Sequence, residues 1–241
     1  MLNRRGPFIA RLGRLAAGAG LCALLAATGP GASAAPIPAE LAEALAGFRA
    51  DGPKGWSFTQ TTATGGESQV EHFDPLAPEF RRWTLVEKNG RPPSADELEN
   101  YFQGKTRRTA GITAPRIQDQ LDAATATRID SENGRSRWRF QMKPGGADDI
   151  SARFLAVTLT FHEATRTIER LEIASLGPFS PVLAVKILET KTVMSYGLPT
   201  KDRPSLLERV TLHLRGRAFW FKSLDQDMTV TFSDQTLAVK K

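Results

Sequence analysis

The second half of the chain alternates between apolar and polar residues with a period of two. Residues 155–161 read LAVTLTF, with a large apolar residue at every second position. Successive side chains of a strand point to opposite faces, so this period marks strands with one buried face. Turn pairs such as Asn133-Gly134 and Gly145-Gly146 separate the segments. The pattern predicts an antiparallel sheet with strands at 137–142, 155–161, 168–173, 182–196 (one strand or two with a break), 210–215 and 228–239.

The first half of the chain mixes helices with short strands. Leu41, Leu45 and Phe48 fall on one face of a helix predicted over residues 39–50. Roughly ten strands in one sheet have to curl or close to limit their exposed edges. The fold class is therefore α+β, mainly β. The other predicted elements are strands at 56–62, 68–73 and 80–87, a short helix capped by Ser94 and Glu97, and a second short helix beginning near Thr113 and running to about Leu121.

Residues 1–34 predict a secretory signal peptide. Four arginines precede an apolar run over residues 15–28 that carries no charge, and small residues stand just before Ala34. This run is shorter than the ~20 residues that span a bilayer. We therefore expect cleavage after Ala34, a single half-barrel domain over residues 35–241, no transmembrane segment after cleavage, and a soluble protein in the periplasm.

Removal of the signal would change the chemistry that the composition suggests. The signal holds four of the 32 Lys and Arg residues and none of the 26 Asp and Glu residues, so cleavage would lower the formal net charge from +6 to +2. It also holds Cys22, the only cysteine, so residues 35–241 contain no thiol. We expect no nucleic-acid partner. The Arg4-Arg5 pair leaves both the general secretion route and the twin-arginine route open.

A helix followed by three short strands opens residues 35–241. The first strand reads WSFTQ at residues 56–60, the second ends at Phe73, and the third carries Trp83. This order resembles the periplasmic lipoprotein-carrier (LolA-like) superfamily, with similarity at the level of residues over 41–83 and similarity of pattern beyond. The resemblance implies a curved antiparallel sheet that forms an unclosed barrel, with the N-terminal helix and two short inserted helices against its concave face. It further implies a hydrophobic hollow that holds acyl chains.

Aromatic residues are the candidates to line such a hollow. An ordinary packed core is the default interpretation of aromatic residues on alternating strands, but a large hollow would leave part of the set lining open or lipid-filled space. No ligand-contacting residue of the superfamily corresponds to a position in this chain, so the candidates rest on residue type alone. They are Trp56, Phe58, Trp83, Trp138 and Phe140.

Two clusters combine basic residues with a tryptophan. On a strand, such alternation usually gives one solvated face and one packed face. The alternative is a rim that contacts phosphate headgroups, a protein partner or the peptidoglycan. The clusters are Arg135, Arg137 and Arg139 beside Trp138, and Arg215, Arg217 and Lys222 around Trp220.

No spacing of residues indicates a catalytic, metal or cofactor site. His162-Glu163 begins like a zinc-protease helix, but Arg166 stands where the second histidine belongs. No serine lies in a Gly-x-Ser-x-Gly turn. An enzyme would need a polar cleft that brings His72, His162 and His213 near carboxylates, and we expect neither catalysis nor a cofactor.

Export, a β-rich fold and the absence of a catalytic motif favour a binding function. The first hypothesis is a periplasmic protein that binds or carries a lipid, an acyl chain or a lipoprotein in the hollow of a half barrel. The alternative is an envelope protein-interaction or sensor module that uses the same fold with no lipid cargo and docks a protein partner instead.

Overall fold

The computed structural model describes residues 37–50, 54–108, 117–145 and 150–239 of the chain. The predicted signal and its cleavage site lie outside these residues. All the helices and strands below belong to one compact unit, Ala34–Lys241. Among the described residues, no helix combines the length and the apolar character needed to cross a membrane.

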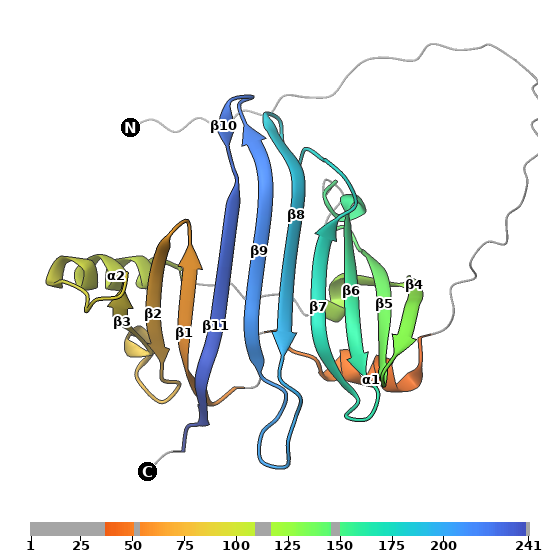
Figure 1. Cartoon of the computed structure of the whole chain (residues 1–241), viewed down its shortest axis with the longest axis horizontal. Coiled ribbons are helices and arrows are strands. Elements are labelled where there is room, and N and C mark those ends of the chain that lie inside the picture. The colour runs from red at the N-terminus through yellow and green to blue at the C-terminus, as the bar shows by residue number, and fades with distance from the viewer. Residues whose placement is uncertain (1–36, 51–53, 109–116, 146–149, 240–241) are drawn as a thin grey trace, which may run out of the picture. The chain divides into compact units, whose positions relative to one another are not determined.

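A single antiparallel sheet of 11 strands makes up most of this unit (Figure 1). The strand order is β3-β2-β1-β11-β9-β8-β7-β6-β5-β4, and β10 pairs with β9. The path ends at β3 and β4, so the sheet does not close. In chain order the strands are β1 (Trp56–Thr64), β2 (Glu67–Phe73), β3 (Trp83–Lys88), β4 (Leu121–Glu132), β5 (Arg135–Met142), β6 (Leu155–His162), β7 (Thr167–Ser175), β8 (Val185–Tyr196), β9 (Leu207–Ala218), β10 (Lys222–Ser223) and β11 (Gln226–Leu237).

The first and last strands of the unit lie side by side. β11 pairs with β1 from Trp56 opposite Leu237 to Thr64 opposite Met228. The strands before the helical insertion, β1 to β3, therefore lie at one end of the strand order. β4 to β9 lie at the other end, and β11 stands between the two sets. The prediction of a mainly β, antiparallel and unclosed sheet is confirmed.

The sequence pattern did not predict strand β4. It begins at Leu121, where the second inserted helix was expected to end, and its pairing with β5 shifts register between Asp122 and Thr127 and again between Arg128 and Asp130. Each irregularity adds unpaired residues to one strand and interrupts the period of two. An alternation test therefore overlooks this strand.

In the part of the chain that the structure describes, three helices accompany the sheet, together with short 3-10 turns at Glu79–Arg81 and Ala152–Phe154. The capping box of the second helix is confirmed: Glu97 N donates to Ser94 Oγ at 3.3 Å, and Ser94 N donates to Glu97 Oε2 at 2.8 Å. That helix has 14 residues and is longer than predicted, whereas the third has four; its expected cap at Thr113 lies outside the described residues. The helices are α1 (Ala39–Gly47), α2 (Ala95–Arg108) and α3 (Ile117–Gln120).

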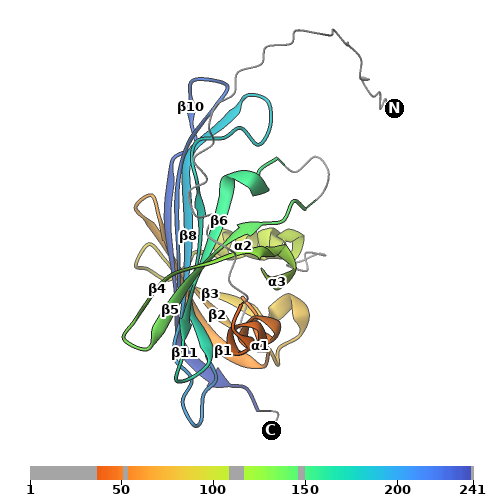
Figure 2. The ribbon, with the colours of Figure 1, turned by 90° about the vertical axis from the view of Figure 1, so that its right-hand side faces the viewer.

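The helices lie on one face of the sheet (Figure 2). α1 contacts β7 and α3, and its Leu41 and Leu45 are buried there. Complete burial of a side chain of this size contributes roughly 1.5–3 kcal/mol. We call the buried cluster between α1, α3 and strands β4 to β8 the packed core; it consists of Leu41, Leu45, Ile117, Leu121, Ala126, Trp138, Phe140, Val157, Leu159, Phe161, Ile168, Leu171 and Tyr196.

Candidate functional site

Four aromatic side chains form a cluster on the same sheet face as the packed core, but over strands β1 to β3 and β11. Phe58 on β1 lies directly opposite Phe73 on β2, which lies opposite Trp83 on β3. The ring centroids of Phe58 and Phe73 are 5.0 Å apart and stacked, and Trp83 meets Phe58 edge-on at 5.6 Å. Phe232 on β11 completes the cluster, edge-on to Phe58 at 5.5 Å. Such pairs stabilise each other by ~0.5–1.5 kcal/mol beyond area burial.

A cavity of ≈ 630 Å³ lies against this cluster. Its volume falls within the range of roughly 300–1,000 Å³ that is typical of small-molecule sites. We call it the aromatic hollow. Its lining residues are Lys54, Gly55, Trp56, Phe58, Phe73, Pro75, Leu76, Arg82, Leu206, Leu207, Phe232 and Gln235.

Among the described residues of this lining, the charged ones are two cations, Lys54 and Arg82. Arg82 Nε donates to the carbonyl of Ala77 at 3.3 Å. Neither Lys54 nor Arg82 forms an ion pair with a carboxylate within the part of the chain that the structure describes. The hollow thus combines an aromatic wall with positive charge, which suits a ligand with an apolar chain and an anionic end.

Leu207 separates the aromatic hollow from the packed core. Its side chain packs against the packed core and also lines the hollow. Gln235 Nε2 donates to the carbonyl of Leu207 at 2.6 Å and ties β11 to the start of β9. The two apolar regions are therefore neighbours on one sheet face rather than opposite faces of it.

A buried carboxyl group links α2 to the aromatic side of the sheet. Glu71 on β2 accepts hydrogen bonds from Gln60 Nε2 at 3.1 Å and from the Tyr101 hydroxyl at 2.7 Å. Burial, and secondarily the bond to Glu71, raise the pKa of Tyr101 well above its usual value. The hydroxyl therefore stays protonated and remains a donor, which holds α2 against β2.

The N-terminus of α2 is held by a charged network. Glu97 accepts two hydrogen bonds of 2.9 Å from the Arg91 guanidinium and lies 3.3 Å from Lys88 Nζ. The bond from Arg91, followed by that from the Ser94 backbone, lowers the pKa of Glu97 to about 2. This carboxylate is ionised at neutral pH and favourably placed beside the positive end of the helix dipole.

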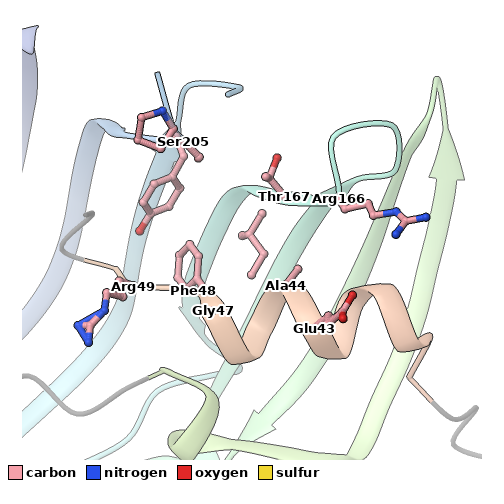
Figure 3. A pocket seen from close by; sticks show the side chains of 11 residues that line it. Glu43, Ala44, Gly47, Phe48, Arg49, Arg166, Thr167 and Ser205 are labelled. Atoms are coloured by element: carbon pink, nitrogen blue, oxygen red, sulfur yellow. The ribbon is translucent and has the colours of Figure 1, made fainter. Parts of the chain in front are cut away.

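A second, smaller cavity of ≈ 300 Å³ lies where α1 ends (Figure 3). Phe48 and Tyr196 meet edge-on there at 5.1 Å, and the Tyr196 hydroxyl donates to the carbonyl of Ala50 at 3.2 Å. Figure 3 shows charged side chains around it, Arg49 on one side and Glu43 on the other. With half the volume of the aromatic hollow and a charged surround, it is the weaker site for an acyl chain.

The five predicted hollow residues separate into two groups. Trp56 and Phe58 line the aromatic hollow, and Trp83 belongs to its aromatic cluster. Trp138 and Phe140 lie instead in the packed core, 3% and 1% exposed, and line no part of the hollow. They are strand residues of the same alternating type, so the sequence carried no signal that distinguished them.

Two aromatic residues that line the aromatic hollow, Phe73 and Phe232, were not among the candidates. Phe73 ends β2 opposite Phe58, and the short glycine turn between β1 and β2 could have indicated that pairing. Phe232 lies on the last strand, and the β1–β11 pairing brings it to Phe58. A pairing between strands so distant in the chain leaves no local pattern.

The three histidines lie on separate strands that are not neighbours in the sheet. His162 on β6 bonds Thr165 in the following turn at 2.8 Å. His213 on β9 bonds Asp227 at 2.7 Å, and His72 is on β2. Within the described ranges, no group of three His, Cys, Asp or Glu side chains is placed to hold a metal ion.

The first basic cluster follows the alternation of β5. Its arginines point away from the buried Trp138, and Arg135 bonds Glu169 while Arg137 bonds Asp130. The bond from Arg137 lowers the pKa of Asp130. One solvated face with cross-strand ion pairs is therefore the arrangement found at this cluster.

The fold and the site together define an unclosed antiparallel sheet with a packed core and an aromatic hollow on one face. Comparison with protein-family models, curated proteins and solved structures found no match to this chain.

Proposed function

We propose that this protein is an exported, periplasmic carrier that shelters an acyl chain of a lipid or lipoprotein in the aromatic hollow, without catalysis. The observation that carries the proposal is the ≈ 630 Å³ cavity beside four clustered aromatic rings. Such a cavity offers an acyl chain apolar contact over much of its length. The resemblance of residues 41–83 to the lipoprotein carriers points to the same class of cargo.

The physical basis of binding would be apolar burial with one electrostatic contact. Burial of apolar surface contributes roughly 25 cal/mol per Å², so a long acyl chain needs no directional contacts to bind. Lys54 and Arg82 would attract a carboxylate or phosphate at the end of that chain. A neutral hydrocarbon would gain only the first of these two contributions.

The test is the composition of the protein as the cell processes it. We would purify the product of the full gene from the envelope fraction, determine its N-terminus by mass spectrometry, and identify molecules in an organic-solvent extract. The proposal predicts cleavage after Ala34 and at least one acyl-chain lipid per protein. A lipid-free protein that also fails to bind added fatty acid would refute it.

A matched pair of variants locates the binding site. Leu76 lines the aromatic hollow and is 45% exposed, whereas Val86 is 50% exposed on β3 and is not among the residues that line the hollow. Leu76→Asp places a negative charge in the hollow and should weaken fatty-acid binding at least roughly tenfold, in keeping with the cost of burying a charge against apolar surface. Val86→Asp adds the same charge at an exposed position outside the hollow and should leave binding unchanged.

The edges of the sheet are the feature that favours the alternative, a protein-interaction module. β4 ends the strand order and is 12 residues long, and an edge strand can pair with an extended segment of a partner. Substitution of Ile129, which is exposed on β4, by proline would block such pairing. Loss of a co-purifying protein in this variant, from a preparation that contains no lipid, would favour the alternative.

A further inference from the structure

The turns before β8 and after β9 form an apolar tip that no other part of the described structure covers. The β9–β10 turn extends beyond the ends of β1 and β7, with the start of β8 beside it (Figure 1). Phe219 N donates to the carbonyl of Ala184 at 2.8 Å, which joins this turn to the loop before β8. We call the exposed apolar residues of the two turns the apolar tip; they are Val182, Leu183, Phe219, Trp220 and Phe221.

These side chains are exposed to an extent that is unusual for large apolar residues. Leu183 is 99% exposed, Trp220 88% and Phe221 86%. Isolated exposed apolar residues are normal on protein surfaces, but a contiguous group marks an interaction site. The base of the loop is ordered, because Phe179 and Ile187 exchange two backbone hydrogen bonds and Phe179 stacks on Phe154. The apolar tip therefore extends from a base that backbone hydrogen bonds and aromatic stacking hold in place.

The backbone of the tip is also strained. Phe219 has φ of 50°, Trp220 of 70° and Ala184 of 69°, in the left-handed region that glycine and asparagine adopt most easily. Hairpin turns of this kind normally place Gly or Asn at such positions. Aromatic residues there lower stability, and strain of this type accumulates where side-chain identity serves a function.

Positive charge surrounds the apolar tip. Lys186 on β8 lies opposite Arg217 on β9, and Lys222 follows the aromatic turn on β10. All three side chains are exposed, and segments 181–187 and 217–224 contain no Asp or Glu. The nearest carboxylate in sequence, Asp225, accepts a hydrogen bond from Gly216 N. Exposed Phe and Trp side chains with Lys and Arg next to them are typical of surfaces that enter the interface of a bilayer with anionic headgroups.

We propose that the apolar tip docks the protein on a membrane surface that contains anionic phospholipid. The five apolar side chains would enter the headgroup region, while Lys186, Arg217 and Lys222 would contact phosphates. A specific protein interface engages roughly 20–30 residues on each side, far more than this narrow, convex tip offers, whereas a bilayer requires no complementary pocket.

The proposal is independent of the cargo in the aromatic hollow. β9 runs from Leu207 at the hollow to Ala218 at the tip, roughly 35 Å at ~3.3 Å per residue. A substitution in one site is therefore too distant to alter the other by contact. Membrane binding and lipid content can be measured separately on the same variant.

The test compares vesicle binding of the processed protein and its variants. Phe219→Asn, Trp220→Gly and Phe221→Ser are combined, because Asn and Gly suit the positive φ angles and the variant should melt at the same temperature or higher. On vesicles of phosphatidylethanolamine and phosphatidylglycerol, we expect roughly a hundredfold weaker partitioning than for the unaltered protein. The matched control is Phe80→Ser, an exposed phenylalanine on the turn before β3, which should bind normally.

Two further variants keep the test independent of that turn. Val182→Ser with Leu183→Ser removes the apolar residues of the neighbouring loop and should also weaken partitioning. Replacement of Lys186, Arg217 and Lys222 by Gln should weaken it roughly fivefold per cation on anionic vesicles and have no effect on phosphatidylcholine. Equal vesicle binding by the unaltered protein and the tip variants, or dimerisation through the tip in place of vesicle binding, would overturn the proposal. Lipid retained in the hollow of a tip variant would show that the two proposals succeed or fail separately.

Discussion

The packed core and the aromatic hollow are two apolar regions on one face of one sheet, and they differ in what covers them. α1 and α3 seal the packed core, so Phe140 and Leu159 are almost wholly buried. The hollow is rich in rings too, but its four clustered aromatic residues are only partly buried, and the space beside them is open. Aromatic content alone therefore does not distinguish a core from a binding cavity; the covering helix does.

The largest expected effect is the loss of an aromatic ring from the packed core. Phe140→Ala should lower the free energy of unfolding by about 3–5 kcal/mol, because the ring is fully buried and its neighbours cannot collapse into the space. Urea denaturation of the purified protein measures this loss. A loss below about 1 kcal/mol would mean that the region under α1 is loosely packed.

The same substitution in the hollow should act on binding more than on stability. Phe58→Ala removes a partly buried ring that already faces open space, so we expect a loss of about 1–2 kcal/mol in stability. Fatty-acid binding should fall at least roughly tenfold, since the variant removes the ring at the centre of the aromatic cluster. If Phe58→Ala and Phe140→Ala destabilise equally, the contrast between the two regions is wrong.

A smaller effect is expected where α2 joins the aromatic side. Tyr101→Phe removes the hydroxyl that donates to the buried Glu71 and should cost about 1–2 kcal/mol, with faster hydrogen exchange confined to α2. Tyr196→Phe is the matched control, because its hydroxyl bonds the carbonyl of Ala50 beside the packed core. Exchange in α2 should be normal in that control.

The smallest effect is the acid response of the α2 N-terminus. The folded pKa of Glu97 is lowered to about 2, so its stabilisation is complete above the unfolded pKa of about 4.3 and is lost as the pH falls from there toward 2. We expect hydrogen exchange near Ser94 to accelerate over that window, whereas Glu97→Gln should be insensitive to it. Glu99→Gln, on the same helix, should retain the pH response.

Much of the fold could be predicted because its determinants are local. Alternation located β5, β6 and β7, and the pairing of Ser94 with Glu97 located the start of α2. β4 was not among the predicted strands, because its irregular pairing breaks the alternation. Of the five candidates, Trp56 and Phe58 line the aromatic hollow, Trp83 lies in the adjoining aromatic cluster, and Trp138 and Phe140 lie in the packed core; Phe73 and Phe232 were not among the candidates.

The sequence by itself determined which residues alternate, where turns form, and therefore that the protein is built on an antiparallel sheet. These properties depend on neighbours within a few positions of the chain. Only the tertiary structure decided that β11 pairs with β1, that α1 covers one part of the sheet face, and that a cavity stays open in the other. The reason is physical: an aromatic side chain on a strand has the same preference for burial everywhere, and whether it ends in a core or in a cavity depends on what a distant segment of the chain places above it.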